Sequence, residues 1–123
     1  HVCSDVFEFL NQQVKAGDYD LIVCDPPAFA KGGSHLEQAK DAYIGLNQKC
    51  FELLEVGGIL VTSSCSGRLV TEDFRNVIKI AAGRAKKNAR VIAALGQAFD
   101  HTDKISFPEG RYLKTLILEV IPL

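Results

Sequence analysis

Several features are scarce or missing in this sequence, and each absence narrows the class of protein. Met and Trp do not occur among its 123 residues, and because it does not begin with Met we expect it to be part of a longer protein. Its 14 Lys and Arg residues are offset by 15 Asp and Glu, whereas nucleic-acid-binding modules usually carry a basic excess. No apolar run reaches the roughly 18 residues of a membrane helix, so no membrane partner is expected. The chain has the composition of a globular protein, with 47% hydrophobic residues, and the length of about one domain.

Cysteine is sparse and widely spaced, at Cys3, Cys24, Cys50 and Cys65, with no C-x-x-C pair. Histidine is equally scarce, so no metal site is expected. A chain of this size can form a core without disulfides, and we therefore expect reduced thiols, as in a cytoplasmic protein. Cys24 and Cys50 fall on apolar faces, which predicts that they are packing residues.

The spacing of apolar residues predicts helices that alternate with short strands. From Leu36 to Leu53 apolar residues recur at intervals of 3 and 4, which is typical of an amphipathic helix. Helices are expected at 4–16 (capped by Ser4 or Asp5 and ended by Gly17 and Asp18), at 35–55, and from a cap at Thr71 to about 85, with strands at 19–25, 58–65, 90–95 and 112–121. The continuous apolar run of the first strand is typical of burial on both faces. This order predicts an α/β fold with a doubly wound, mostly parallel sheet and an antiparallel last strand, because no helix precedes that strand.

The first candidate site follows the strand at 19–25 and reads DPPAFAKGG. Asp25 places an acid at the strand end, where ligands gather in open α/β sheets, and Pro26 and Pro27 stiffen the backbone behind it. Phe29 offers an aromatic face for stacking on a substrate, and Lys31 offers a positive charge. The same residue types also form ordinary rigid turns, so this segment alone does not establish a site.

The second candidate site follows the next strand and reads SSCSG. Cys65 lies among small residues, where its sulfur is open to close approach and can act as a nucleophile if a base activates it. His101 is the one histidine in a predicted loop that is a candidate for this base. The alternative interpretation of Cys65 is a buried packing residue at a strand end. Because successive parallel strands end at the same edge of a sheet, we expect Cys65 and Asp25 to be neighbours facing one cleft.

The sequence resembles a known family through four segments in order: YDLIVCDPPAFAK, EVGGILVTSSCSG, FPEGRYLK and the strand that follows. The family is the S-adenosylmethionine-dependent methyltransferases that form 5-methylcytosine in large-subunit ribosomal RNA, the bacterial class with an N-terminal RNA-binding PUA domain. The likeness runs over essentially the whole chain. It implies a Rossmann-like methyltransferase sheet of seven strands, of which this chain holds strands four to seven.

The resemblance also implies roles for individual residues. Asp5 corresponds to the acid that contacts the adenine of S-adenosylmethionine. Asp25, Pro26 and Pro27 correspond to the motif between the methyl donor and the target base. Cys65 corresponds to the catalytic thiolate, which adds to C6 of a flipped-out cytosine.

Two parts of the family pattern do not occur in the chain. They are the glycine-rich turn with the ribose-binding acid and the PUA domain, so residues 1–123 correspond to the C-terminal part of a catalytic domain. We expect the chain alone to bind cofactor weakly and to be inactive. The strand at 19–25 is then an open, apolar sheet edge, which predicts a homodimer or another contact that covers it.

Three alternatives remain open. A methyltransferase that acts on an exocyclic base amine uses a similar D-P-P motif and needs no cysteine. A non-catalytic half-domain has only a structural or interaction role. A dinucleotide-dependent oxidoreductase is disfavoured, since no G-x-G-x-x-G occurs. Arg68, Arg111 and Lys114 are candidates for contact with RNA phosphates, but on a near-neutral chain we interpret them as ordinary surface charges. Tyr112 is interpreted as a core residue in preference to a stacking platform.

Overall fold

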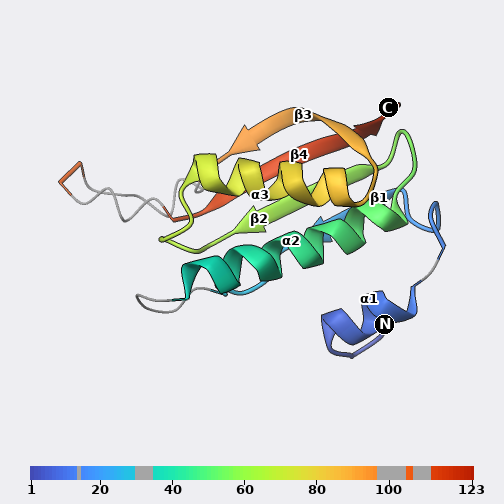
Figure 1. Ribbon diagram of the computed structural model, residues 1–123, viewed down its shortest axis with the longest axis horizontal. Coiled ribbons are helices and arrows are strands. Elements are labelled where there is room, and N and C mark those ends of the chain that lie inside the picture. Colours follow the sequence, from blue (N-terminus) through green and yellow to red (C-terminus); the bar gives the residue numbers. More distant parts are fainter. Residues whose placement is uncertain (14, 30–34, 97–104, 107–111) are drawn as a thin grey trace.

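The computed structural model describes residues 1–13, 15–29, 35–96, 105–106 and 112–123. Within them, three helices and four strands form an α/β fold (Figure 1). In chain order the elements are α1 (Val6–Gln12), β1 (Leu21–Cys24), α2 (Leu36–Leu53), β2 (Ile59–Ser64), α3 (Thr71–Arg84), β3 (Asn88–Leu95) and β4 (Lys114–Ile121). The predicted alternation of helices and strands is confirmed.

The four strands form one sheet in the order β1-β2-β4-β3. Strands β1 and β2 are parallel, and β4 lies antiparallel between β2 and β3. The last strand is therefore antiparallel, as the sequence predicts. It is also central, and its side chains alternate strictly between buried and half-buried positions.

Helices α2 and α3 lie side by side on one face of the sheet (Figure 1). This placement differs from the helices on both faces that a doubly wound sheet has. The chain advances in one direction across the sheet, from β1 to β2 and on toward β3. Right-handed crossovers that advance in the same direction place their helices on the same face.

The core lies between this helical layer and the sheet. The inward face of α2 is buried along its length, as its spacing predicts, with Tyr43 and Phe51 fully enclosed. Strand β4 contributes Leu116, Leu118 and Val120 from the opposite side. In the described part of the chain, no helix is long and apolar enough to cross a membrane.

Helix α1 begins where the sequence predicts and ends earlier. Asp5 is its N-cap, and Oδ1 of Asp5 accepts hydrogen bonds from the backbone N–H groups of Phe7 (3.0 Å) and Glu8 (3.1 Å). The helix ends after Gln12 instead of continuing to residue 16, because Gln13 adopts an extended backbone with ψ of 113°. Residue 14, within the predicted helix, lies outside the described residues.

Other boundaries also differ from the prediction: β1 and β4 each begin two residues later than expected, at Leu21 and Lys114. Thr71 is the first residue of α3 and not its cap; Val70 is the N-cap and makes no side-chain cap bond. Strand β3 begins two residues earlier than expected, at Asn88.

Strand β1 forms an edge of the sheet, as the resemblance implies. The expectation that it is buried on both faces is wrong, because Leu21 is 56% and Val23 65% exposed. Only Cys24 of this strand is buried, beneath α2. The apolar sequence therefore predicts the strand correctly, but it does not predict how deeply the strand is buried.

Candidate active site

The two candidate segments lie at the same edge of the sheet. Cys24 is paired in parallel register with Thr62, so both strands deliver their carboxyl ends there. Asp25 directly follows Cys24, and Cys65 lies three residues beyond Thr62. The structure thus brings together the two strand ends that the sequence analysis selected.

The turn after β2 is fixed by hydrogen bonds on both sides of Cys65. The Ser64 hydroxyl donates to Oη of Tyr43 (3.2 Å) and accepts from the backbone N–H of Ser66 (3.2 Å). The carbonyl of Ser66 accepts from Nζ of Lys114 (2.7 Å). Cys65 itself is half-buried and belongs to no disulfide. The backbone that carries this thiol is therefore held in place while its side chain remains accessible.

One buried polar atom in this turn stands out. The hydroxyl of Ser66 is enclosed and has no hydrogen-bond partner among the described residues. By contrast, the hydroxyl of Ser63 lies 2.7 Å from that of Thr115 on the neighbouring strand. The turn is thus well bonded except at the hydroxyl of Ser66, whose backbone N–H and carbonyl both have partners.

Tyr43 connects the two segments from α2. Its ring lies 4.7 Å from the ring of Phe29 in an edge-on contact, and its hydroxyl accepts the bond from Ser64. Burial raises the pKa of Tyr43, while hydrogen bonds with Ser64 and with the Phe29 backbone oppose that rise. A buried phenol whose pKa is raised stays neutral, so Tyr43 acts as a fixed hydrogen-bonding link between the two strand ends.

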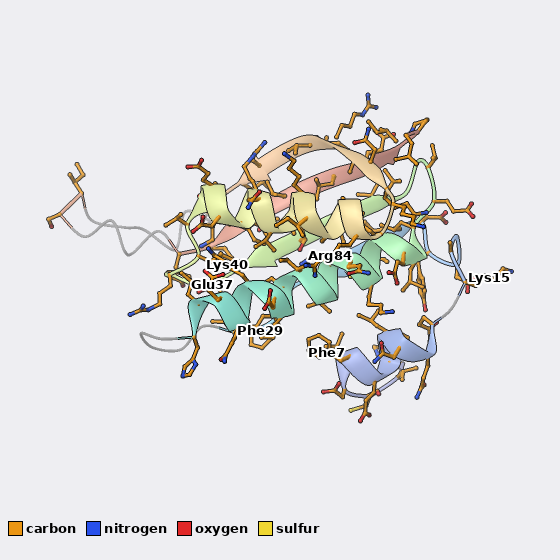
Figure 2. The ribbon with its side chains drawn as sticks, in the orientation of Figure 1. Phe7, Lys15, Phe29, Glu37, Lys40 and Arg84 are labelled. Atoms are coloured by element: carbon orange, nitrogen blue, oxygen red, sulfur yellow. The ribbon has the colours of Figure 1, made fainter. Side chains whose placement is uncertain are left out.

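Phe29 is half-buried and packs against the core, between Tyr43 and α1. The rings of Phe7 and Phe29 lie 6.3 Å apart, and Figure 2 shows the two side chains facing each other. This contact places the start of α1, where Asp5 lies, close to the segment after β1. A hollow of about 550 Å³ lies beside Phe29, lined also by Ala28 and by His35, Gln38, Ala39 and Ala42 of α2 and its start.

Asp25 is exposed, and no ion pair involves it among the residues that the structure describes. Pro26 is half-buried and Pro27 exposed beside it. An unpaired carboxylate at a strand end can accept hydrogen bonds from an amino group of a ligand. Lys31 and His101 lie outside the described residues, and so does Arg111.

The other cysteines separate clearly from Cys65. Cys24 and Cys50 are buried, as predicted for packing residues, and Cys3 is exposed. The hydrogen bond with Cys24, together with burial, raises the pKa of the Cys50 thiol. Cys24 and Cys50 are thus enclosed and hydrogen-bonded to each other, which leaves Cys65 as the partly exposed thiol at the strand ends. No group of three His, Cys, Asp or Glu residues in the described ranges is placed to hold a metal ion.

Sequence reasoning missed Lys114. It was interpreted as a surface charge, but its side chain is only 7% exposed and its ammonium donates to two backbone carbonyls. The alternation of β4 carried a signal, because Lys114 has the same parity as the buried Leu116, Leu118 and Val120. The core assignment of Tyr112 is wrong as well, since this side chain is exposed.

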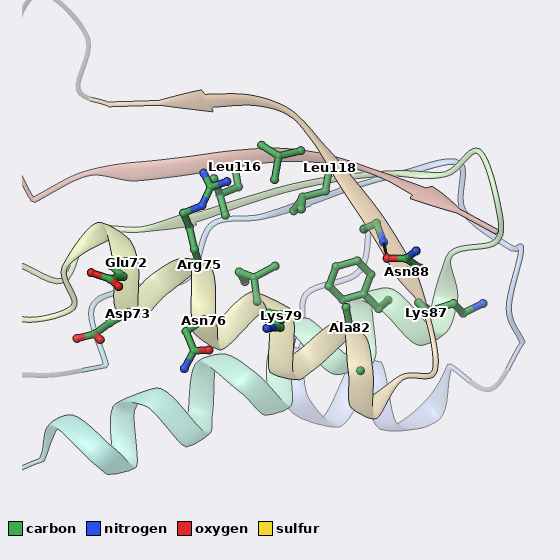
Figure 3. Close-up of a pocket in the computed structure, with 15 residues that line it drawn as sticks. Glu72, Asp73, Arg75, Asn76, Lys79, Ala82, Lys87, Asn88, Leu116 and Leu118 are labelled. Atoms are coloured by element: carbon green, nitrogen blue, oxygen red, sulfur yellow. Dashed lines mark hydrogen bonds between the residues drawn. The ribbon is translucent and has the colours of Figure 1, made fainter. Parts of the chain in front are cut away.

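A larger groove, of about 690 Å³, lies elsewhere in the molecule. It runs between α3 and the strands β3 and β4, with Arg75 and Lys79 on one wall and Leu116 and Leu118 on its floor (Figure 3). None of the residues after β1 or β2 that carry the candidate chemistry lines it. Size alone therefore does not identify the site, and the strand ends remain the candidate active site.

Solved structures of similar shape come from proteins that are assigned as methyltransferases or methylases. SMU.776, a protein assigned as a methyltransferase and solved with bound SAH, matches with a TM-score of 0.75 at 22% identity, over 95% of this chain and 30% of its own. TTHA0409 from Thermus thermophilus, assigned as a DNA modification methylase and solved with S-adenosyl-L-methionine, matches with a TM-score of 0.61 at 17% identity, over 97% and 51%. At such identities the likeness establishes the fold, a partial Rossmann-like sheet of the kind that methyltransferases use.

Sequence comparison gives closer relatives. The ribosomal RNA large subunit methyltransferase I of Shewanella frigidimarina is 42% identical over 118 residues, which is 95% of this chain and 30% of the relative. The protein of the same name from Aeromonas hydrophila is 40% identical over 115 residues, 93% of this chain and 29% of the relative. The chain thus spans about 30% of the length of these curated relatives. No protein-family model matches it.

Proposed function

We propose that this chain is part of an S-adenosylmethionine-dependent methyltransferase that acts on large-subunit ribosomal RNA. The identity of about 40% with ribosomal RNA large subunit methyltransferase I proteins runs over nearly the whole chain. The same fold occurs in proteins solved with SAH or S-adenosyl-L-methionine. Ribosomal RNA is accordingly the proposed partner of the protein that contains this chain.

The proposed chemistry is methylation at C5 of cytosine through the thiolate of Cys65. The sulfur adds to C6 of an extruded base, and the electron pair of the C5–C6 double bond makes C5 nucleophilic. S-adenosylmethionine supplies the methyl group that C5 accepts. Loss of the C5 proton to a base then restores the double bond and expels the thiolate. The net result is one methyl group on carbon, with the cysteine regenerated.

The residues at this edge fit the donor and the base. Asp25 offers an unpaired, exposed carboxylate for an amino group, beside Pro26 and Pro27. Asp5 lies at the start of α1, two residues before Phe7, whose ring lies 6.3 Å from that of Phe29. In this proposal Asp5, Asp25, Pro26 and Pro27 hold the cofactor, Phe29 and Lys31 contact the substrate, and Cys65 and Asp25 are catalytic.

The observation that carries the proposal is the shared edge. An accessible thiol on a well-bonded turn and a free carboxylate follow two adjacent parallel strands, whose ends are linked through Tyr43. Ligands of open α/β sheets bind at such carboxyl ends. A nucleophile and an acceptor for a base amine at one edge suit an attack on a pyrimidine ring.

Replacement of Cys65 tests this proposal in the protein that contains the chain. Cys65→Ala is expected to lower the rate of cytosine C5 methylation of ribosomal RNA on the order of 10³-fold or more, because the covalent route is lost. Cys3→Ala is the matched control, since Cys3 is an exposed cysteine to which the proposal assigns no role, and it should leave the rate unchanged. C5 methylation that survives in Cys65→Ala would overturn the proposal.

A second candidate function is methylation of an exocyclic base amine. The exposed carboxylate of Asp25 favours it, because such chemistry needs an acceptor for the amino group and no thiol. The same variants separate the two. Amine methylation survives Cys65→Ala and is lost in Asp25→Asn, whereas C5 methylation is lost in both.

A further inference from the structure

Lys114 is a buried ammonium group beside the proposed nucleophile. Its side chain is 7% exposed, and Nζ donates to the carbonyls of Ser66 and Tyr112, each at 2.7 Å. In the antiparallel register Lys114 lies opposite Ser64, so the cation is level with the end of β2. A single side chain of β4 therefore bonds to the turn that carries Cys65.

This charge lacks an acidic partner. Among the described residues no carboxylate forms an ion pair with Lys114, and its two acceptors are neutral carbonyls. A buried cation without a counter-ion is costly. Burial accordingly lowers the pKa of Lys114, and the electrostatic interaction with Cys65 opposes that effect. Cys65 is thus the group that supplies negative charge to this ammonium when its thiol ionises.

We propose that Lys114 is a positioning residue for Cys65, which holds the turn through the Ser66 carbonyl and stabilises the thiolate by its positive charge. The proposal deepens the proposed function and rests on it, since it assigns a partner to the same nucleophile. The thiolate in turn balances the buried ammonium, so each charge favours the other.

The other titratable groups near Cys65 do not replace Lys114. Tyr43 approaches from α2 and interacts electrostatically with Cys65, but its raised pKa keeps it neutral. Asp25 follows β1 at the same edge and is exposed, and as an anion it opposes a thiolate. Lys114 from β4 is a buried cation that hydrogen-bonds to this turn, whereas Arg68, three residues after Cys65, is exposed.

The pH dependence of Cys65 alkylation tests the proposal without any methyl transfer. In a Cys3→Ser background, iodoacetamide is applied over neutral to mildly alkaline pH, and modified Cys65 is quantified by peptide mass spectrometry. Lys114→Met is expected to react more slowly near neutral pH, on the order of tenfold, because the positive charge that favours the anionic sulfur is lost. Lys114→Arg, which keeps the charge, should restore most of the rate.

Lys49→Met is the matched control, because Lys49 is a half-exposed lysine of α2 paired with Glu52; its profile should equal that of the parent. Identical profiles for Lys114→Met and the parent, with unchanged circular dichroism, would overturn the proposal.

A reciprocal measurement covers the case in which Lys114→Met fails to fold. Coupling between two sites is mutual, so loss of the thiolate must also act on the ammonium. In Cys65→Ser, the Lys114 ammonium, followed by carbon NMR of labelled lysine, should lose its proton at lower pH than in the parent. An unchanged titration would refute the coupling. Retained C5 methylation in Cys65→Ala refutes the proposed function instead, so the two failures are distinguishable.

Discussion

Ser64 and Ser66 flank Cys65 in sequence, and both side chains are buried, yet their bonding differs. Ser64 has two hydrogen-bond partners, whereas the hydroxyl of Ser66 has none in the described part of the chain. A buried hydroxyl without a partner costs free energy, and its removal can be neutral or stabilising. The pair therefore offers a comparison in which position and burial are matched.

Ser64→Ala is expected to lower the free energy of unfolding by about 1–3 kcal/mol, because it leaves Tyr43 and the Ser66 amide without their partner. Ser66→Ala is expected to leave stability unchanged or to raise it. Urea unfolding of both variants measures the two effects. Equal destabilisation by both substitutions would show that the hydrogen bonds of Ser64 do not contribute to the free energy of unfolding.

Lys114 also predicts a pH dependence of stability. Its pKa in the folded chain is lowered below the ordinary value of 10.5 by burial. Between the folded-state pKa and 10.5 the unfolded chain binds more protons, so the free energy of unfolding rises as pH increases through this window. In urea unfolding at several pH values, the parent should gain stability relative to Lys114→Met across the window and level off above it. A difference that stays constant with pH would contradict the assignment.

At the scale of elements, α2 is anchored to β2 by a buried polar pair. Nδ2 of Asn47 donates to the carbonyl of Tyr43 (2.8 Å), and the hydroxyl of Thr62 donates to Oδ1 of Asn47 (2.6 Å). Both side chains are fully enclosed. The pair fixes how the helix that carries Tyr43 sits on the strand that leads to Cys65.

Asn47→Leu is expected to destabilise the chain by about 1–3 kcal/mol, since the buried Thr62 hydroxyl then loses its amide acceptor. Adding Thr62→Val removes that hydroxyl, so the double variant should cost less than the sum of the single ones, with a coupling on the order of 1 kcal/mol. Gln48→Leu, at the next and less buried position of α2, is the control. Strict additivity in the double-mutant cycle would exclude the proposed anchor.

The sequence predicts an element well when the interactions that form it lie within the same segment. The buried face of α2 and the cap at Asp5 follow from spacing and from a side chain that bonds within its own turn. The early end of α1 and the exposure of Val23 depend on backbone conformation and on neighbouring layers, which local patterns do not encode. Lys114 is an intermediate case, because its parity in β4 pointed inward while its charge suggested the surface.

The same distinction applies to the candidate site. Asp25 and Cys65 were expected to share an edge because parallel strands end together, and the register of β1 and β2 confirms that edge. The link through Tyr43 and the ammonium of Lys114 required the three-dimensional packing of α2 and β4 against the turn. The motifs of the site could therefore be predicted from the sequence, whereas the contacts between distant segments could not.

At the scale of the whole molecule, β1 and β3 are the two edge strands of the sheet in the described residues, and β1 is the one that the resemblance leaves without its partner strand. Leu21 and Val23 are exposed on a strand whose far side has no neighbour in the described ranges. Unprotected apolar edges pair readily with other strands. We propose that this edge is covered by a second copy of the chain when the chain is studied alone.

Light scattering over a range of protein concentrations tests this proposal. The average mass of the chain should rise with concentration toward that of a dimer, and Val23→Lys should suppress the rise, because an edge lysine blocks strand pairing. Val56→Lys is the control, since Val56 is equally exposed but lies in the turn before β2. A mass that stays monomeric at every concentration would rule out the dimer.

The central claim, a covalent bond between Cys65 and C6 of a cytosine, is tested most directly with 5-fluorocytidine in the target RNA. Fluorine replaces the C5 proton whose loss releases the thiolate, so the adduct should persist after methyl transfer. The protein that contains this chain should form, with S-adenosylmethionine, a stable RNA–protein adduct that mass spectrometry maps to Cys65 and that Cys65→Ala abolishes. Efficient methylation of the unmodified RNA together with no adduct, or an adduct at another residue, would contradict the account.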